Sequence, residues 1–270
     1  MQTLTDRAAL ARNRTRAHDA FLRNRVADDV QERLAEVNRS FTAPVIVTPT
    51  PDLWQDRLPS AQIAADDDTL AVSDQAHDLL IHDLNLHWAQ DLVGQLVQSR
   101  RALAPDGLFI GTLFGGQTLH ELRTCLAEAE AQVTGGLSPR VAPMAEIRDL
   151  GGLLQRAGFA LPVADSDVVR VSYTDAFALM RDLRAMGETN ALHTRLRHPT
   201  RRAVVLEAAQ LYSLHFAGPD GRITATFEVV TLTGWAPADS QQKPLRPGSA
   251  KSRLADALGA VETPLKRTDD

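Results

Sequence analysis

One strand–helix–strand unit, within residues 77–123, constrains the fold more than any other part of this chain. Residues 78–84 read Asp-Leu-Leu-Ile-His-Asp-Leu, a short apolar run typical of a strand that a parallel sheet buries on both faces. Apolar residues then recur at steps of three and four up to Leu103, which predicts an amphipathic helix. Residues 104–107 predict a turn, and residues 108–113 a second strand. Because parallel strands need such a crossover, the chain is predicted to form an α/β fold.

The same periodicities, together with proline and glycine positions, predict the other elements. Thr118 and Glu121 have the spacing of a capping box at the start of a helix. Alternation over residues 223–231 favours an antiparallel final strand. The remaining helices are expected within 6–39, from 118 to about 133, from Pro143 to Gly158, from 177 to 186 and from 199 to 216, and the remaining strands at 45–47, 62–65 and 168–173.

Composition indicates an ordinary folded protein whose net charge does not attract it to nucleic acid. With 270 residues and 44% hydrophobic residues, the chain can bury a full α/β core. A net charge of −5 argues against nucleic acid as a partner. No apolar run is long enough to span a membrane, and the N-terminus has no apolar signal region, so a cytoplasmic, soluble protein is expected. Cys125 is the one cysteine and is interpreted as a small buried hydrophobic residue.

Several motifs give the chain a family resemblance. It resembles class I S-adenosylmethionine-dependent methyltransferases, and most nearly the bacterial relatives of the methyltransferase-like assembly factor of respiratory complex I. A more distant similarity is to the malonyl-carrier methyltransferase of biotin synthesis. The resemblance covers roughly residues 6–258. The motifs that carry it are DLLIHDLNLHW, RRALAPDGLFIGTLFGG, RDLGGLLQRAGFALPVADSD, LMRDLRAMGETNAL, LTGWAP and QQKPLRPGSAKSRLADAL.

The resemblance implies a Rossmann-like three-layer sandwich, with a mostly parallel sheet and an antiparallel last strand. Periodicity and composition divide the chain into an N-terminal helical segment (1–40), the α/β domain (41–236) and a Pro/Ser-rich tail (237–270). The resemblance also implies S-adenosylmethionine as cofactor and methyl transfer as the reaction, although some relatives are thought to hydroxylate an arginine. A respiratory complex subunit would then be the protein partner.

The chain departs from this family where the cofactor should bind. A glycine-rich loop should follow the first strand, because the backbone must approach the ligand closely. Residues 48–54 instead read Thr-Pro-Thr-Pro-Asp-Leu-Trp, and the first glycine of the chain is Gly94. Residues 48–61 leave room for one crossover but not for two with a strand between them. We therefore expect one strand and a helix to be missing, and with them the acid that binds the ribose.

Five residues are the candidates for cofactor binding. Asp66 and Asp67 follow the strand at 62–65, where the family places acids near the adenine; a solvated turn is the alternative. Asp83, Asn85 and Trp88 follow the strand at 78–84, and ligands of open parallel sheets bind beyond the carboxyl ends of strands. Trp88 could instead fix the next helix against the sheet.

Four further residues are candidates for the substrate side of the pocket: His87, Arg140, Glu188 and Asn190. A structural use of each, in capping or in a buried ion pair, is the alternative. The histidines near His82 lack the spacing of a metal site, so no metal is expected. No catalytic residue is assigned. The arginines of the first helices are interpreted as a solvated face, or else as a surface for an acidic partner.

Two hypotheses of different classes follow. The first is an S-adenosylmethionine-dependent methyltransferase, or a relative that uses the same cleft. The second is a non-catalytic assembly protein that kept the scaffold and lost the cofactor. Loss of a strand would also expose a sheet edge, which predicts a homodimer formed there.

Overall fold

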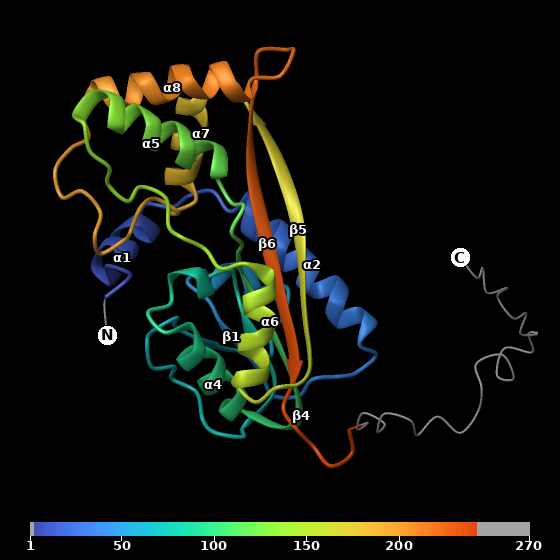
Figure 1. Cartoon of the computed structure of the whole chain (residues 1–270). Helices are drawn as coiled ribbons and strands as arrows, with labels where there is room; N and C mark the ends of the chain where they lie inside the picture. The colour runs from blue at the N-terminus through green and yellow to red at the C-terminus, as the bar shows by residue number, and fades with distance from the viewer. Residues whose placement is uncertain (1–2, 242–270) are drawn as a thin grey trace, which may run out of the picture. The chain divides into compact units, whose positions relative to one another are not determined.

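The computed structural model describes residues 3–241 of the chain (Figure 1). Residues 1–238 form one compact unit, and residues 239–270 form a second, most of which lies outside the described residues. The sequence also favours a short helix near residues 253–258, which lies outside the described residues. The domain boundaries 1–40, 41–236 and 237–270 stay predictions. Among the described residues, no helix combines the length and the apolar character needed to cross a membrane.

A six-stranded mixed sheet has the strand order β2-β1-β3-β4-β6-β5. The first four strands in this order are parallel, and β6 runs antiparallel to both β4 and β5. Strand β2 pairs directly with β1, with Ile63 opposite Ile46, so no strand lies between them. The expected α/β sheet with one antiparallel strand is confirmed. The strands are β1 (Pro44–Val47), β2 (Gln62–Ala64), β3 (His77–His82), β4 (Leu103–Phe114), β5 (Ala160–Tyr173) and β6 (Ile223–Trp235).

Helices cover both faces of the parallel strands, as the three-layer expectation requires. Neighbouring strand residues point to opposite faces. Accordingly, Leu80 packs in the cluster with α4 (Leu92–Ala102) and α6 (Ile147–Arg156). Ile81 packs in a different cluster with α2 (Phe21–Glu36) and α3 (Asp52–Gln55).

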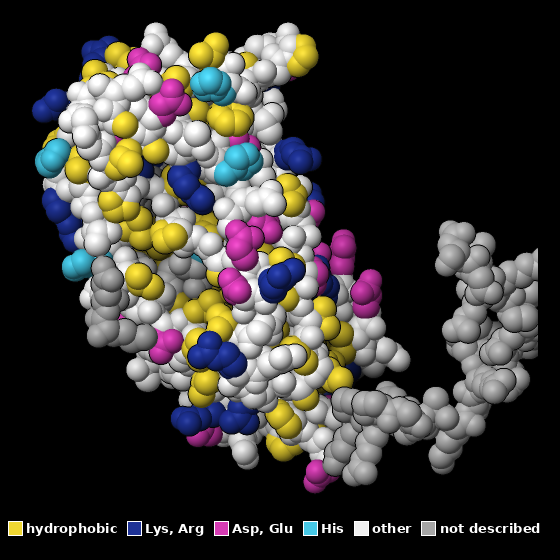
Figure 2. All heavy atoms as spheres, in the orientation of Figure 1, with side chains coloured by type: hydrophobic (Ala, Val, Ile, Leu, Met, Phe, Trp, Pro, Cys, Tyr) yellow, Lys and Arg dark blue, Asp and Glu magenta, His cyan; other side chains and the backbone are white. Residues whose placement is uncertain are grey.

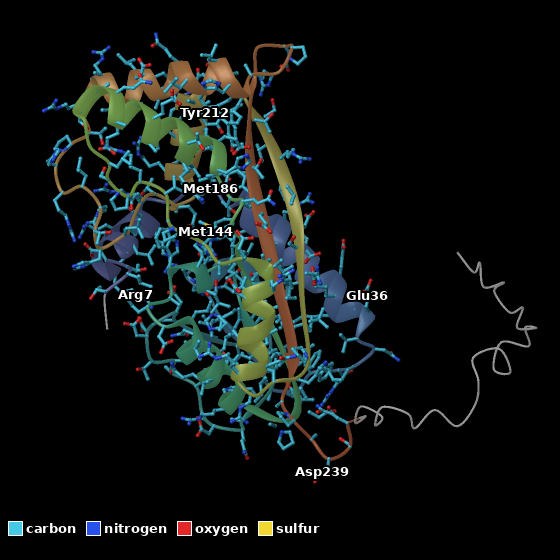
Figure 3. All side chains as sticks on the ribbon, in the orientation of Figure 1. Arg7, Glu36, Met144, Met186, Tyr212 and Asp239 are labelled. Atoms are coloured by element: carbon cyan, nitrogen blue, oxygen red, sulfur yellow. The ribbon has the colours of Figure 1, made fainter. Side chains whose placement is uncertain are left out.

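A group of three helices forms a separate apolar core on the first half of β6. These are α5 (His120–Thr134), α7 (Ala176–Ala185) and α8 (Arg202–Phe216), and Figure 1 shows them together at one end of the long β5–β6 pair. Tyr212 of α8 points into this cluster (Figure 3). The first helix, α1 (Arg7–Thr15), packs instead beside Trp88 and Leu192.

Glycines end three helices as the sequence predicted. Gly135, Gly158 and Gly187 have φ values of 73°, 87° and 78°, and each directly follows the C-terminal turn of α5, α6 or α7. Positive φ carries no Cβ penalty for glycine, which suits it to this position.

Three local predictions are wrong. Residues 104–107 do not separate the helix from the strand but form an irregular bulge inside β4, since His77 pairs with Leu103 whereas Leu79 pairs with Leu108. Pro143 does not open a helix, because α6 begins only at Ile147. The capping box at residues 118–121 is also absent: Leu119 is the N-cap, with φ 53° and no side-chain cap. Tertiary partners from β6 take the two side chains, as Thr118 Oγ1 donates to the Glu228 carbonyl and Glu121 accepts from Thr226.

Candidate functional site

The loop after β1 lies across the carboxyl ends of β1 and β3. Thr48 Oγ1 donates to Asp83 Oδ2 at 2.7 Å, and Thr50 Oγ1 donates to the same oxygen at 3.3 Å. The Asp83 side chain is 0% exposed. Asp83 therefore serves to hold this loop and does not face an open cleft.

Arg23 of α2 connects Asp83 to a second buried carboxylate, that of Glu188. Arg23 Nη1 donates to the Asp83 carbonyl at 3.0 Å, and Nη2 donates to Glu188 Oε1 at 3.0 Å. Glu188 Oε2 accepts from Trp88 Nε1 at 2.8 Å and lies 3.3 Å from His87 Nε2. Both oxygens of Glu188 are thus occupied by groups of the chain itself.

The pKa of Glu188 reflects these partners. Burial alone would raise it, but the hydrogen bond from His87 and the positive charges of Arg23 and Arg14 lower the pKa to about 2. Burial lowers the pKa of His87, which favours the neutral ring. At neutral pH the pair Arg23–Glu188 is consequently a compensated ion pair inside the protein.

Two arginines of α1 hold the acidic segment after β2. Arg14 Nη1 donates to both carboxylate oxygens of Asp66, at 2.9 and 2.8 Å. Arg7 donates to Asp68 at 2.9 Å, while Asp67 contributes only its carbonyl, which accepts from Gln95. The expected solvated face is therefore wrong for these arginines and for Arg23, because each is committed to an acid at this edge of the sheet.

The space left between α1 and the strand ends is about 10 Å³. It is bounded by Arg7, Asp66, His82, Asn85 and Gln95, among others. Asn85 is itself engaged, since its Nδ2 donates to the Val47 carbonyl and its Oδ1 lies 2.7 Å from His82 Nδ1. A volume of this size accommodates roughly one water molecule.

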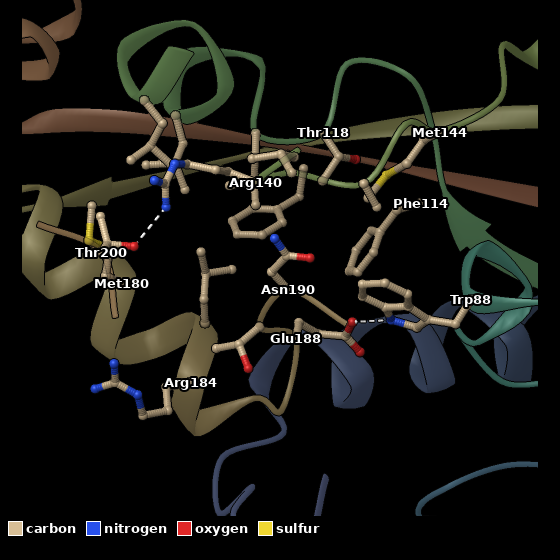
Figure 4. A pocket seen from close by; sticks show the side chains of 18 of the residues that line it. Trp88, Phe114, Thr118, Arg140, Met144, Met180, Arg184, Glu188, Asn190 and Thr200 are labelled. Carbon is tan, nitrogen blue, oxygen red and sulfur yellow. Dashed lines mark hydrogen bonds between the residues drawn. The ribbon is translucent and has the colours of Figure 1, made fainter. Parts of the chain in front are cut away.

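A much larger cavity, about 330 Å³, lies next to this region, between α5, α7 and the segments at residues 140–144 and 188–190 (Figure 4). Figure 2 shows apolar side chains gathered in a hollow between α5 and α1 on the same face. Most of the lining side chains are apolar: Trp88, Phe114, Leu119, Leu122, Leu126, Val141, Ala142, Met144, Met180, Leu183, Val205 and Phe227.

Four of the nine candidate residues line this cavity, namely Trp88, Arg140, Glu188 and Asn190. His87 does not line it; its ring packs behind, against Phe114 at 4.7 Å between centroids. The other four candidates (Asp66, Asp67, Asp83 and Asn85) lie at the strand ends instead. The structure thus splits the candidates into two places, and their roles stay predictions.

The two arginines of the cavity wall differ in their hydrogen bonds and ion pairs. Arg140 donates to Glu130 through Nε and Nη2, at 3.0 and 2.6 Å, and to Thr200 at 2.8 Å (Figure 4). The bidentate contact lowers the pKa of Glu130 to about 2. Arg184, by contrast, has no hydrogen-bond acceptor and no ion-pair partner within residues 3–241. Sequence reasoning missed Arg184, although it stands inside the quoted motif LMRDLRAMGETNAL.

The described residues also offer no prepared metal site. Nowhere in residues 3–241 do three or more His, Cys, Asp or Glu side chains gather as a metal ion would require.

The sheet, with its antiparallel β6, its helices on both faces and a cavity beyond the carboxyl ends of its strands, defines an α/β protein of the class I methyltransferase-like type. The chain is 36% identical over 234 residues to arginine-hydroxylase NDUFAF5 of Danio rerio, covering 87% of this chain and 72% of that protein. It belongs to the NDUFAF5 family.

The chain is also similar to other proteins. Malonyl-[acyl-carrier protein] O-methyltransferase of Xylella fastidiosa is 37% identical over 179 residues, covering 66% of this chain and 58% of that protein. Among solved structures, a proposed methyltransferase of Bacillus halodurans matches 77% of this chain and 99% of its own, with 10% identity and a TM-score of 0.47. No family model matches the chain. The chain spans between about half and three quarters of the length of the NDUFAF5 relatives.

Proposed function

We propose that this chain is a non-catalytic binding protein on a methyltransferase scaffold, whose cofactor position is closed by its own side chains. The observation that carries the proposal is the commitment of both strand-end acids. Asp83 is held by Thr48 and Arg23, and Asp66 is held by Arg14. Both oxygens of Asp66 and Oδ2 of Asp83 are thereby engaged, and Asp83 Oδ1, which has no hydrogen-bond partner, is buried.

The available space supports the same reading. Ligand pockets for cofactor-sized molecules occupy about 300–1,000 Å³, whereas the space among Asp66, Asn85 and α1 is about 10 Å³. The residues there do not fit S-adenosylmethionine unless α1 leaves its place. The loop at residues 48–54 contains no glycine, so its backbone cannot form the close phosphate-type cradle that such ligands use.

The name of the relatives suggests arginine as a target, but the cavity does not favour a guanidinium group. Among the described residues Glu188 is the one acid that lines the cavity, and Arg23, Trp88 and His87 already contact its oxygens. An incoming guanidinium would compete with these three partners for the carboxylate. We therefore propose action by binding a partner, for which the resemblance suggests a subunit of a respiratory complex. A cytoplasmic location stays a prediction.

The second candidate is an S-adenosylmethionine-dependent enzyme. Membership of a methyltransferase-like family and the 37% identity to a malonyl-carrier methyltransferase favour it. For this candidate, α1 would have to move, and Asp66 and Asp83 would have to break their ion pairs with Arg14 and Arg23 in order to bind the ligand.

Calorimetric titration of the full chain with S-adenosylmethionine and S-adenosylhomocysteine separates the two candidates. We expect no heat of binding and no rise in melting temperature at millimolar ligand. Binding at micromolar affinity would overturn the proposal, because it would show that the strand-end acids are available. Circular dichroism of the same preparation confirms that the tested protein is folded.

A further inference from the structure

We propose that the 330 Å³ cavity binds a small apolar carboxylate, with Arg184 pairing with its carboxylate group and the apolar wall receiving its hydrocarbon part. This inference rests on the proposed function in one respect: it makes this cavity, rather than the cofactor position, the ligand site of the protein.

The wall of the cavity suits a flexible hydrocarbon group. Leu119, Leu122 and Leu126 come from α5 and its start, and Met180 and Leu183 come from α7. Leucine and methionine side chains adapt to irregular apolar ligands, because methionine in particular has many rotamers of similar energy. Burial of the apolar wall and of the apolar part of the ligand favours binding, but this hydrophobic contribution does not fix the orientation of the ligand. A polar group is then needed to fix orientation.

The charges of the wall indicate the sign of that polar group. Three charged residues line the cavity, and two of them are already compensated: Arg140 by Glu130 and Glu188 by Arg23. Arg184 is the third, and no acid among residues 3–241 pairs with it. The uncompensated charge of the cavity is therefore positive, which complements an anion.

The position of Arg184 fits a ligand with one apolar and one charged end. Its side chain is exposed, and it lines both this cavity and a neighbouring open one. In Figure 4 its side chain projects from α7 at the edge of the cavity, on the side away from Phe114 and Trp88. A carboxylate bound there keeps contact with water while its tail is buried. The planar guanidinium also matches a carboxylate with two parallel hydrogen bonds.

Octanoate is a suitable probe because it carries the two proposed features and little else. Isothermal titration of the full chain should show saturable binding of octanoate. Octanol has the same tail without the charge, and octylamine has the opposite charge. Since neither can form the charge-assisted hydrogen bonds with the guanidinium, both should bind at least about tenfold more weakly.

Arg184→Ala should weaken octanoate binding by about tenfold or more. Arg181→Ala is its matched control: Arg181 lies one turn earlier on the exposed side of α7 and lines only the neighbouring cavity. This control should change the affinity by less than about twofold. Leu122→Trp, which fills the cavity, should abolish binding of octanoate in a variant whose circular dichroism is unchanged.

Three results would overturn the inference: no octanoate binding at millimolar concentration, equal weakening by the two arginine variants, or tighter binding of octylamine. The outcome is independent of the titration with S-adenosylmethionine. If both ligands bind, the closed cofactor position is refuted and the carboxylate site stands; if neither binds, the closed position stands and the carboxylate site is refuted.

Discussion

Replacement of Arg23 by methionine should destabilise the protein more than any exposed arginine replacement, because it leaves buried acids without a counter-charge. Arg23 is 7% exposed at its side chain and contacts both Asp83 and Glu188, which are 0% and 8% exposed. Methionine keeps most of the apolar stem volume, so the lost charge dominates the effect.

The magnitude follows from the burial of the ion pair. Removal of one partner of a buried ion pair costs about 3–5 kcal/mol. The lowered pKa of Glu188 agrees in direction only, because the hydrogen bond from His87 contributes to it before the charge of Arg23 does. We therefore expect Arg23→Met to lower the free energy of unfolding by about 3 kcal/mol at pH 7.

The decrease in the free energy of unfolding caused by Arg23→Met should become smaller as the pH is lowered. In the unchanged protein the folded-state pKa of Glu188 is depressed, so its stabilisation is present above 4.5 and is lost as pH falls towards about 2. In Arg23→Met the loss of a nearby positive charge makes the Glu188 pKa higher than in the unchanged protein, so Glu188 of the variant takes up its proton at a higher pH as the solution is acidified. The difference between the two proteins must then be larger at pH 7 than at pH 4.

Urea unfolding followed by far-ultraviolet circular dichroism at both pH values measures the effect. Arg25→Met is the matched control, since Arg25 lies on the same helix but pairs with Asp167 at 59% and 60% side-chain exposure. It should cost less than about 1 kcal/mol. Two results would refute the explanation by a buried charge. One is a decrease in the free energy of unfolding for Arg23→Met that is no larger than the decrease for Arg25→Met. The other is a decrease for Arg23→Met that is as large at pH 4 as at pH 7.

Three further outcomes follow from the structure. Glu130→Gln should reduce the loss of stability that the unchanged protein shows between pH 4.5 and about 2, the range in which Glu130 loses its ion pair with Arg140 while Glu188 also titrates; equal urea midpoints of the two proteins across this range would contradict the assignment. Cys125 is buried and its pKa is raised to about 11, chiefly by burial, so iodoacetamide at pH 8 should label it only in urea; rapid labelling of the folded protein would show that α5 opens. Because β2 is an edge strand with Ile63 39% exposed, sedimentation at micromolar concentration should show a dimer, and a monomer would refute it.

The sheet could be predicted because its signals are local. Apolar runs such as residues 78–84 lie in strands that are buried on both faces, and the alternating run from Ile223 lies in the antiparallel β6. The short spacing over residues 48–61 was equally informative, since β2 pairs directly with β1. Chain length between strands is a geometric limit, and it does not depend on distant partners.

The predictions that failed depend on partners far away in the sequence. Thr118 and Glu121 had the spacing of a capping box, but β6 supplies better partners for both side chains once the fold is closed. Arg23 is one of the arginines that the sequence interprets as a solvated face or as a surface for an acidic partner. Its partner Glu188 lies 165 positions away. No local pattern contains that information.

The absence of a glycine-rich loop after β1 and the presence of Arg14 and Arg23 in the first two helices are related. The strand ends of this fold still carry acids, Asp66 and Asp83, which without a ligand would be buried charges of high cost. Arg14 and Arg23 compensate these acids from within the chain. Under the proposal of a closed cofactor position, a glycine-rich loop introduced at residues 48–54 would not by itself create a cofactor site, because Arg14 and Arg23 would still pair with the two acids. The proposal therefore requires both changes together for binding.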